Sequence, residues 1–335
     1  MKKILLIGTG GTIACGHSSD GLKPLLTPNQ LLSYVKDCEA FCETEAIQLM
    51  NLDSTNIEPK HWLMMAACIE EHYNDFDGFV ICHGTDTMAY TAAALSYLIQ
   101  NSPKPIVITG AQKPIDLEDT DARVNLTDSL HLAACPKAKD VCVVFDGKII
   151  AGTRAKKEHS KSYDAFASVN FPYLGTIYEG HVQLYFEEAK PEQPVQFYHE
   201  MKPEVCLLKL VPSMSAEVLD YMAQRSDAVI IESFGVGGLP VYENSNFFQV
   251  VRKWTEKGKV FVMGTQVARE GSNLSVYEVG KRVKENPGVI ETYDMTLEAA
   301  LTKLMWILAQ TKDPDQIRRM FSGQVNHDIL WNEKI

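Results

Sequence analysis

The stretch Phe79-Val80-Ile81-Cys82-His83-Gly84-Thr85-Asp86-Thr87 and the residues directly after it decide the fold. Its first four residues are apolar without alternation, which is typical of a parallel strand covered by helices on both faces. Beyond the turn, Met88, Ala92, Leu95 and Ile99 recur at the spacing of one helix face. Asp86 and Thr87 stand where helix caps and favourable charge belong. The stretch therefore predicts a strand, a hydroxyl-bearing turn and a helix.

Short β-branched runs alternate with longer helical patterns along the whole chain, which indicates an α/β protein. We expect a larger N-terminal domain, 1–190, with a doubly wound, mainly parallel sheet. A polar, proline-bearing linker, 191–204, and a smaller α/β domain, 205–335, follow. Asp146-Gly147 lies between two apolar runs and predicts a β-hairpin, because both residues tolerate positive φ. The expected strands are 4–7, 79–82, 106–108, 141–145, 205–210, 228–231 and 260–263, and the expected helices are 88–99, 216–224, 247–257 and 297–310.

Composition narrows the class of function. The chain has 335 residues, 45% of them hydrophobic, and a formal net charge of −11. Without an excess of Lys and Arg it is poorly suited to a phosphate backbone, so we expect a small-molecule ligand and no nucleic acid. No apolar run approaches the length of a bilayer span, so no membrane partner is expected.

Cysteine and histidine usage predicts a cytoplasmic protein without a metal or other cofactor. The eight cysteines contain no C-x-x-C, and several lie in apolar runs, as buried reduced thiols do. Cys38 and Cys42 have helical spacing, but no nearby histidine completes a metal site. The apolar run Ile4–Ile7 stops at Gly8, which favours a first strand over a signal peptide.

A second turn that carries hydroxyl groups suited to catalysis follows that first strand. Its sequence is Thr9-Gly10-Gly11-Thr12-Ile13-Ala14. It differs from a dinucleotide fingerprint, because Ile13 occupies a position that needs a small residue. Residues 14–30 are rich in Gly, Ser and Pro, so we expect a loop there, and a mobile lid is one role for it. A noncatalytic nucleotide-binding protein is therefore the least favoured function.

The turns after Ile7 and Cys82 can meet, because the carboxyl ends of parallel strands share one edge of a sheet. Alone, Thr12 or Thr85 would be read as a turn or cap hydroxyl. Together with Asp86 they fit an active site, since a threonine hydroxyl needs neighbours that activate it. Asp53-Ser54-Thr55-Asn56 adds polar groups that suit the ammonium and carboxylate of an amino acid, and the same residues can cap the helix near Pro59.

These segments resemble the threonine-dependent asparaginase/glutaminase family, and within it the cytoplasmic type I L-asparaginases. The likeness covers nearly the whole chain. Each motif alone would be a weak signal, whereas the motifs together are highly specific. The resemblance implies hydrolysis of L-asparagine to L-aspartate and ammonia through a threonine-linked acyl-enzyme, without a cofactor, in a homodimer or homotetramer. The further motifs are Thr109-Gly110-Ala111-Gln112, Asp121 with Asn125-Leu126, Phe166-Ala167-Ser168, Gly235–Pro240, and Asp294-Met295-Thr296 leading into Leu301–Leu304.

By this resemblance Thr12 is the nucleophile, and Thr85, Asp86 and Lys157 complete the catalytic set. Lys156 is the competing register for the lysine. A lysine acts as a base only when neutral, whereas Asp86 favours its charged form. The N–H groups of Gly10-Gly11-Thr12 can approach an oxyanion. The implied substrate-binding positions are Asp53, Ser54, Thr55, Gly84, Thr85 and Asp86, with the main chain near Ala111 close to the leaving amide.

The sequence departs from the family at three positions. A tyrosine usually follows a glycine in the lid, but Leu22 follows Gly21 here. Thr12 then lacks a supporting hydroxyl, so another group replaces it or activity is lower. Some type I members bind asparagine at an effector site through an arginine and a threonine, which are Glu232 and Lys156 here. We expect that effector mode to be absent or altered.

The nearest alternative is a glutaminase-like enzyme or an amidotransferase subunit that generates ammonia on the same fold. Such a subunit usually carries an extra domain ahead of the glycine turn. The first expected strand begins at Lys3, which favours the asparaginase interpretation.

Overall fold

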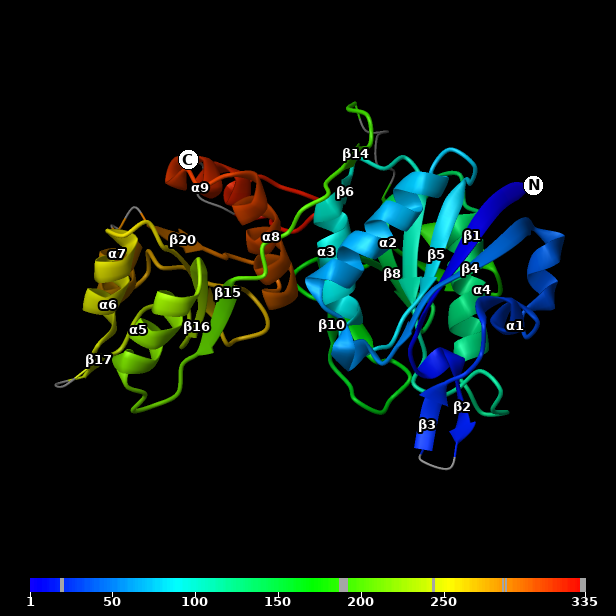
Figure 1. Cartoon of the computed structure of the whole chain (residues 1–335), viewed down its shortest axis with the longest axis horizontal. Coiled ribbons are helices and arrows are strands. Elements are labelled where there is room, and N and C mark those ends of the chain that lie inside the picture. The colour runs from blue at the N-terminus through cyan, green and yellow to red at the C-terminus, as the bar shows by residue number, and fades with distance from the viewer. Residues whose placement is uncertain (19–20, 187–191, 243–244, 285, 287, 332–335) are drawn as a thin grey trace. The chain divides into compact units, whose positions relative to one another are not determined.

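A computed structural model describes residues 1–18, 21–186, 192–242, 245–284, 286 and 288–331. The chain divides into two compact units, Met1–His199 and Glu200–Ile335. Each unit has its own sheet with helices packed against it (Figure 1). The predicted α/β class, with a larger, mainly parallel sheet and a smaller second unit, is confirmed. The linker expected at 191–204 begins outside the described residues and stays a prediction.

The sheet of the larger unit has eight strands in the order β13-β12-β9-β8-β7-β5-β1-β4. The strands from β8 to β4 are parallel, and β9, β12 and β13 continue the sheet in antiparallel fashion. The bounds are β1 Lys2–Gly10, β4 Cys42–Leu52, β5 Gly78–Cys82, β7 Pro105–Thr109, β8 Asp140–Phe145, β9 Lys148–Ala151, β12 Gly175–Tyr178 and β13 His181–Leu184, with helices α1 Pro28–Leu32, α2 Pro59–His72, α3 Met88–Leu98 and α4 Ala122–Ala133.

The central strands are apolar because helices cover both faces of the sheet. Every residue of β5 and β7 is buried. On one face, alternate strand residues such as Leu6 and Val80 pack with Leu126 and Leu130 of α4 and with Leu31 of α1. Helices α2 and α3 lie on the other side of the sheet from α4 (Figure 1). A doubly wound sheet follows from this two-sided burial.

The strand register brings several turns to one edge of the sheet. Gly8 of β1 pairs with Cys82 of β5, and Cys82 pairs in turn with Thr109 of β7. On the other side, Gly10 pairs with Leu52 at the end of β4. The segments that leave β1, β4, β5 and β7 therefore start side by side.

The hairpin predicted at Asp146-Gly147 is present between β8 and β9, with φ of 52° and 67° at its two turn residues. The chain then forms a short ribbon of β10 (Ala155–Lys157) and β11 (Phe166–Ser168). Strands β12 and β13, which the sequence patterns did not predict, extend the sheet beyond β9.

The prediction that residues 14–30 form a loop is wrong in part. Cys15–Ser18 (β2) and Gly21–Pro24 (β3) pair as an antiparallel ribbon, and α1 begins at Pro28. Both strands are short and carry glycine, so local composition resembles a loop while backbone pairing makes the strands. Leu22 lies in β3, and its side chain is outside what the structure describes.

The smaller unit holds a parallel sheet in the order β15-β16-β19-β20. Helices near the predicted positions cover it, and α6 ends two residues earlier than expected. Within the described ranges, no helix is long and apolar enough to cross a membrane. The bounds are β15 Val205–Lys209, β16 Ala228–Ser233, β19 Val260–Thr265, β20 Val289–Glu291, α5 Ala216–Arg225, α6 Phe247–Thr255, α7 Glu278–Lys284, α8 Leu297–Gln310 and α9 Pro314–Ser322, and the short strands β17 Val241–Tyr242 and β18 Ser245–Asn246 pair in this unit. In the larger unit, the short strand β6 Ile99–Gln100 pairs with β14 Gln196–Phe197.

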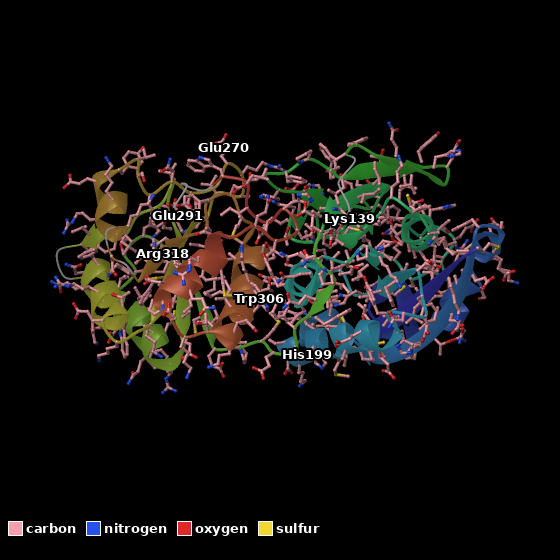
Figure 2. The ribbon with its side chains drawn as sticks, turned by 90° about the horizontal axis from the view of Figure 1, so that it is seen from above. Lys139, His199, Glu270, Glu291, Trp306 and Arg318 are labelled. Atoms are coloured by element: carbon pink, nitrogen blue, oxygen red, sulfur yellow. The ribbon has the colours of Figure 1, made fainter. Side chains whose placement is uncertain are left out.

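A buried ion pair fastens the last described segment to α8. Lys303 Nζ lies 2.6 Å from Asp328 Oδ2, and both side chains are fully buried. The same Nζ donates to the carbonyl of Gly323. Glu291 and Trp306, labelled in Figure 2, are also buried in this unit. Burial lowers the pKa of Lys303, and Asp328 opposes that shift.

Replacing Lys303 by Met should destabilise the smaller unit by about 3–5 kcal/mol, because Asp328 would be left as an uncompensated buried charge. The double variant Lys303→Met/Asp328→Leu should recover part of that loss. Urea unfolding followed by tryptophan fluorescence measures both. A loss below about 1 kcal/mol in the single variant would contradict this account.

Candidate active site

Three turns pack closely against one another at the sheet edge. Gly11 has φ of 79°, and a Cβ there would overlap the main chain of Gly84. A Cβ on Gly84 would in turn lie 2.6 Å from Ser54 Oγ. Glycine is needed at both positions because no side chain fits between the turns. The predicted meeting of the segments after β1, β4 and β5 is therefore present in the structure.

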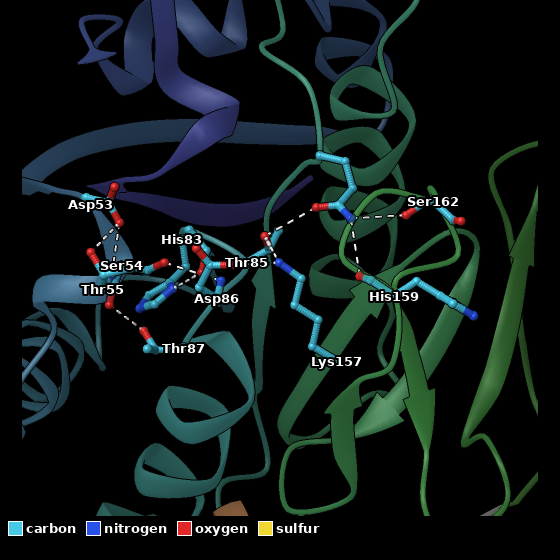
Figure 3. Close-up of polar contacts among 12 residues, drawn as sticks. Asp53, Ser54, Thr55, His83, Thr85, Asp86, Thr87, Lys157, His159 and Ser162 are labelled. Atoms are coloured by element: carbon cyan, nitrogen blue, oxygen red, sulfur yellow. Dashed lines mark hydrogen bonds and ion pairs between the residues drawn. The ribbon is translucent and has the colours of Figure 1, made fainter. Parts of the chain in front are cut away.

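A lysine from the β10–β11 ribbon reaches the second turn. Lys157 Nζ lies 2.7 Å from Thr85 Oγ1 and 2.7 Å from Asp86 Oδ1 (Figure 3). Thr85 is buried, whereas the side chain of Asp86 is 60% exposed. Lys156 is the preceding residue of the same strand, so its side chain points to the opposite face. Of the two registers, Lys157 is the lysine that contacts Thr85 and Asp86.

Ser54 joins the third turn to the second. Its hydroxyl accepts from Asp86 N at 3.3 Å, and its carbonyl accepts from the Thr87 hydroxyl at 2.7 Å. Thr87 occupies the N-cap position of α3, but its side chain makes no capping bond. The expected hydroxyl cap is thus replaced by a tie between two turns.

Asp53 and Thr55 form a local turn at the rim. Asp53 Oδ1 accepts from Thr55 N and Thr55 Oγ1, both at 2.9 Å, and caps the short 3-10 helix Ser54–Asn56. Helix α2 is capped by Glu58 instead, so the expectation that this segment caps that helix is wrong. Both Asp53 and Thr55 are exposed and can face a ligand.

Thr12 opens the 3-10 turn Thr12–Ala14 and is half-buried. Its hydroxyl makes no hydrogen bond to any residue that the structure describes. It follows Gly11 directly and so lies next to the Gly84 turn, while Cys15 Sγ donates to the Gly11 carbonyl at 3.4 Å. The structure therefore brings Thr12 to the site without a bond to Thr85 or Lys157.

A buried histidine network beneath Thr85 was missed by sequence reasoning. His83 Nδ1 lies 2.7 Å from the Gly84 carbonyl, and Nε2 lies 3.0 Å from Thr91 Oγ1. A carbonyl only accepts, so Nδ1 carries the proton, and Thr91 donates to Nε2 while accepting from Trp62 Nε1 at 3.0 Å. Desolvation lowers the pKa of His83 to about 4. The neutral ring holds the Gly84 carbonyl, which turns Thr85 N–H the opposite way.

The turn after β7 is held by a buried carboxylate. Asp121 accepts from Gln112 N at 2.9 Å, from Lys113 N at 3.1 Å and from Asn125 Nδ2 at 3.2 Å. Desolvation raises the pKa of Asp121, while these hydrogen bonds act against that shift. The main chain beside Ala111, which is buried, is therefore fixed at the sheet edge.

Lys156 and Glu232, the two positions where the sequence departs from the effector-binding pattern, belong to different units. Lys156 belongs to β10. Glu232 belongs to β16, with its carboxylate 3.9 Å from Lys209 Nζ and its side chain 14% exposed. Among the described residues, no group of three or more His, Cys, Asp or Glu side chains could hold a metal ion.

Known families match both units. A family described as "Asparaginase, N-terminal" matches residues 3–190, and one described as "Glutaminase/Asparaginase C-terminal domain" matches residues 204–321. The chain belongs to the asparaginase family. This confirms the family that the motifs predicted.

Relatives of this asparaginase-family chain match it from end to end. The L-asparaginase of Thermococcus kodakarensis is 38% identical over 98% of this chain and 99% of its own length. L-asparaginase 1 of Escherichia coli (strain K12) is 34% identical over 98% of each chain. The solved thermostable L-asparaginase from Thermococcus kodakarensis superimposes with a TM-score of 0.93 at 37% identity, over 98% of this chain and 100% of that one.

The same family includes relatives with another name. A glutamyl-tRNA(Gln) amidotransferase subunit of Pyrococcus abyssi is 31% identical over 97% of this chain and 77% of its own length. The alternative weighed from the sequence is thus present among the relatives, at lower identity than the L-asparaginases.

The His83 network predicts an acid-sensitive fold. With a pKa of about 4 when folded against 6.5 when unfolded, the neutral ring contributes stability that is complete above pH 6.5 and lost as pH falls toward 4. Between about pH 7.5 and pH 4.5 the wild type should lose about 2–3 kcal/mol more unfolding free energy than His83→Asn, which keeps a donor for Gly84. Urea titrations at each pH measure this. Parallel losses in the two proteins would rule out the network as the cause.

Proposed function

We propose that the chain hydrolyses L-asparagine to L-aspartate and ammonia, with Thr12 as the nucleophile. One observation carries this proposal. Lys157 Nζ lies 2.7 Å from both Thr85 Oγ1 and Asp86 Oδ1, next to the turn that presents Thr12. A hydroxyl, an acid and an amine that meet at a threonine turn supply the proton transfers that amide cleavage needs.

In the proposed reaction the Thr12 oxygen attacks the carbon of the side-chain amide. The C–N bond then breaks, and ammonia leaves from a covalent aspartyl ester. Thr12 gives up one proton and the leaving nitrogen gains one, so Thr85 and Lys157 end the step as they began it. Water then attacks the ester, releases aspartate and returns the proton to Thr12. Main-chain N–H groups of Gly10–Thr12 are suited to the oxyanion.

The substrate-binding assignment rests on charge and exposure. Asp86 uses Oδ1 for Lys157, and Oδ2 makes no hydrogen bond to a described residue, so it can take the α-ammonium. Asp53 lies at the same exposed rim and adds negative charge. The Ser54 hydroxyl and the N–H groups of Gly84 and Thr85 are donors for the α-carboxylate. Thr55 borders this position and holds Asp53 through its N–H and hydroxyl. The main chain at Ala111 borders the leaving amide.

Two finer assignments belong to the same proposal. We assign the protein to the cytoplasm, because all eight cysteines are free thiols, six of them buried. We also assign a homodimer or homotetramer, on the resemblance to the family alone.

Variants of three of the four assigned catalytic residues, Thr12, Thr85 and Lys157, test the reaction. Thr12→Ala and Thr85→Val should each lower ammonia release from asparagine by on the order of 10³-fold or more, because residues that act as a unit fail together. Lys157→Met should do the same, whereas the neighbouring Lys156→Met should keep activity within about threefold. Circular dichroism checks folding. Full turnover in Thr12→Ala, or loss only in Lys156→Met, would refute the assignment.

The choice of substrate in the same assay distinguishes an asparaginase from a glutaminase-like enzyme or an amidotransferase subunit. Ammonia release should be faster from asparagine than from glutamine at equal concentration, and an amidotransferase subunit would show the reverse order. Because Glu232 and Lys156 replace the effector-binding pair, initial rate against asparagine concentration should be hyperbolic. A clearly sigmoidal curve from the purified protein would overturn that expectation.

A further inference from the structure

The Gln112 side chain bridges Thr85 and the loop that follows Lys157. Thr85 Oγ1 lies 3.3 Å from Gln112 Oε1. On its other side, Gln112 Nε2 lies 3.1 Å from the Ser162 carbonyl and 3.4 Å from the His159 carbonyl. Ser162 and His159 are visible with Thr85 and Lys157 in Figure 3. One amide thus spans the two segments that supply the assigned hydroxyl and amine.

Chemistry fixes the direction of each bond in this bridge. Carbonyl oxygens only accept, so the NH₂ of Gln112 faces the loop and its oxygen faces Thr85. Lys157, paired with Asp86, has only donors, so Thr85 Oγ1 accepts from Nζ. The Thr85 proton therefore points to Gln112. One acceptor site remains on the Thr85 oxygen.

Gln112 is held through its main chain as well as through its side chain. Its N–H donates to the buried carboxylate of Asp121. Besides the Gln112 bridge, a second clasp joins the turn after β7 to the loop after Lys157. In this clasp the Tyr163 hydroxyl lies 3.2 Å from Asp119 Oδ1, and Lys113 Nζ lies 2.6 Å from Asp119 Oδ2. This second clasp makes no bond to Thr85, so it offers a matched control.

We propose that Gln112 is a positioning residue that turns the Thr85 proton away from the nucleophile, so that a Thr85 lone pair faces Thr12. This rests on the proposed function, because it matters only if Thr12 passes its proton to Thr85. The same amide fixes the loop behind Lys157 by its two carbonyl bonds. One side chain thus orients the Thr85 hydroxyl and anchors the loop that follows Lys157.

Steady-state ammonia release tests this. Gln112→Met fills a similar volume without polar atoms and should lower kcat about 10-fold, as expected for the loss of a hydrogen bond worth about 1.4 kcal/mol, with KM within about threefold. Tyr163→Phe removes the second clasp and should keep kcat within about twofold of wild type. An equal loss in the two variants would reduce Gln112 to a loop tether and overturn the proposal.

A carboxylic acid at the same position gives a second readout. Ionised, the side chain of Gln112→Glu would repel the two carbonyls. Protonated, it can donate to one carbonyl and accept from Thr85. The ratio of variant to wild-type kcat should therefore rise about 5-fold or more as pH falls from about 8 to about 5.5, while the Gln112→Met ratio stays flat.

Other groups around Gln112 titrate or carry charge in both proteins, so the ratio removes their effect. They are Lys113, Asp119 and Asp121 on its own segment, Asp86 on the adjoining turn, and Lys157, His159, Tyr163 and Asp164 on the ribbon and its loop. A flat ratio for Gln112→Glu would count against the proposal. Wild-type protein without asparagine turnover would instead refute the proposed function itself.

Discussion

The site depends on the close approach of two main chains at the edge of a parallel sheet. A Cβ on Gly11 would overlap the main chain of Gly84, and a Cβ on Gly84 would overlap the Ser54 side chain. This contact sets the spacing of the threonines that follow, since each lies one residue beyond its glycine. The strand pairing of Gly8 with Cys82 puts the two turns in register before any side chain is considered.

A parallel sheet alone would not supply the amine. The chain reverses at Asp146-Gly147, runs back along β8, and only then forms the ribbon that carries Lys157. That ribbon ends in a loop whose carbonyls are bound by Gln112 from the turn after β7. The amine is thus positioned by antiparallel structure, whereas both hydroxyl turns and Ser54 come from parallel strands.

Sequence reasoning succeeded where local pattern and chemistry agree. Local sequence correctly predicts the strand at 79–82, the helix that begins at Met88 and the hairpin at Asp146-Gly147. It failed at 15–24, because pairing between two glycine-containing strands leaves little trace in composition. Thr87 is the N-cap residue of α3, where the sequence placed it, but its hydroxyl bonds the Ser54 carbonyl in place of the helix, which local sequence does not indicate. The bridge from Gln112 to Thr85 spans 27 residues, and the His83–Thr91–Trp62 network likewise joins separate elements, so no short-range period marks either.

The two polar networks behind Thr85 orient different atoms of that residue. His83, neutral and fully buried, binds the Gly84 carbonyl and thereby directs the Thr85 N–H. Gln112 Oε1 accepts a hydrogen bond from the Thr85 hydroxyl, which by our proposal directs the remaining lone pair of that oxygen. In the proposed reaction Thr85 acts both on the substrate carboxylate and on the nucleophile, and setting these two directions independently allows one residue to do both. Separate networks for its main chain and side chain set the two directions, which neither Lys157 nor Asp86 could do alone.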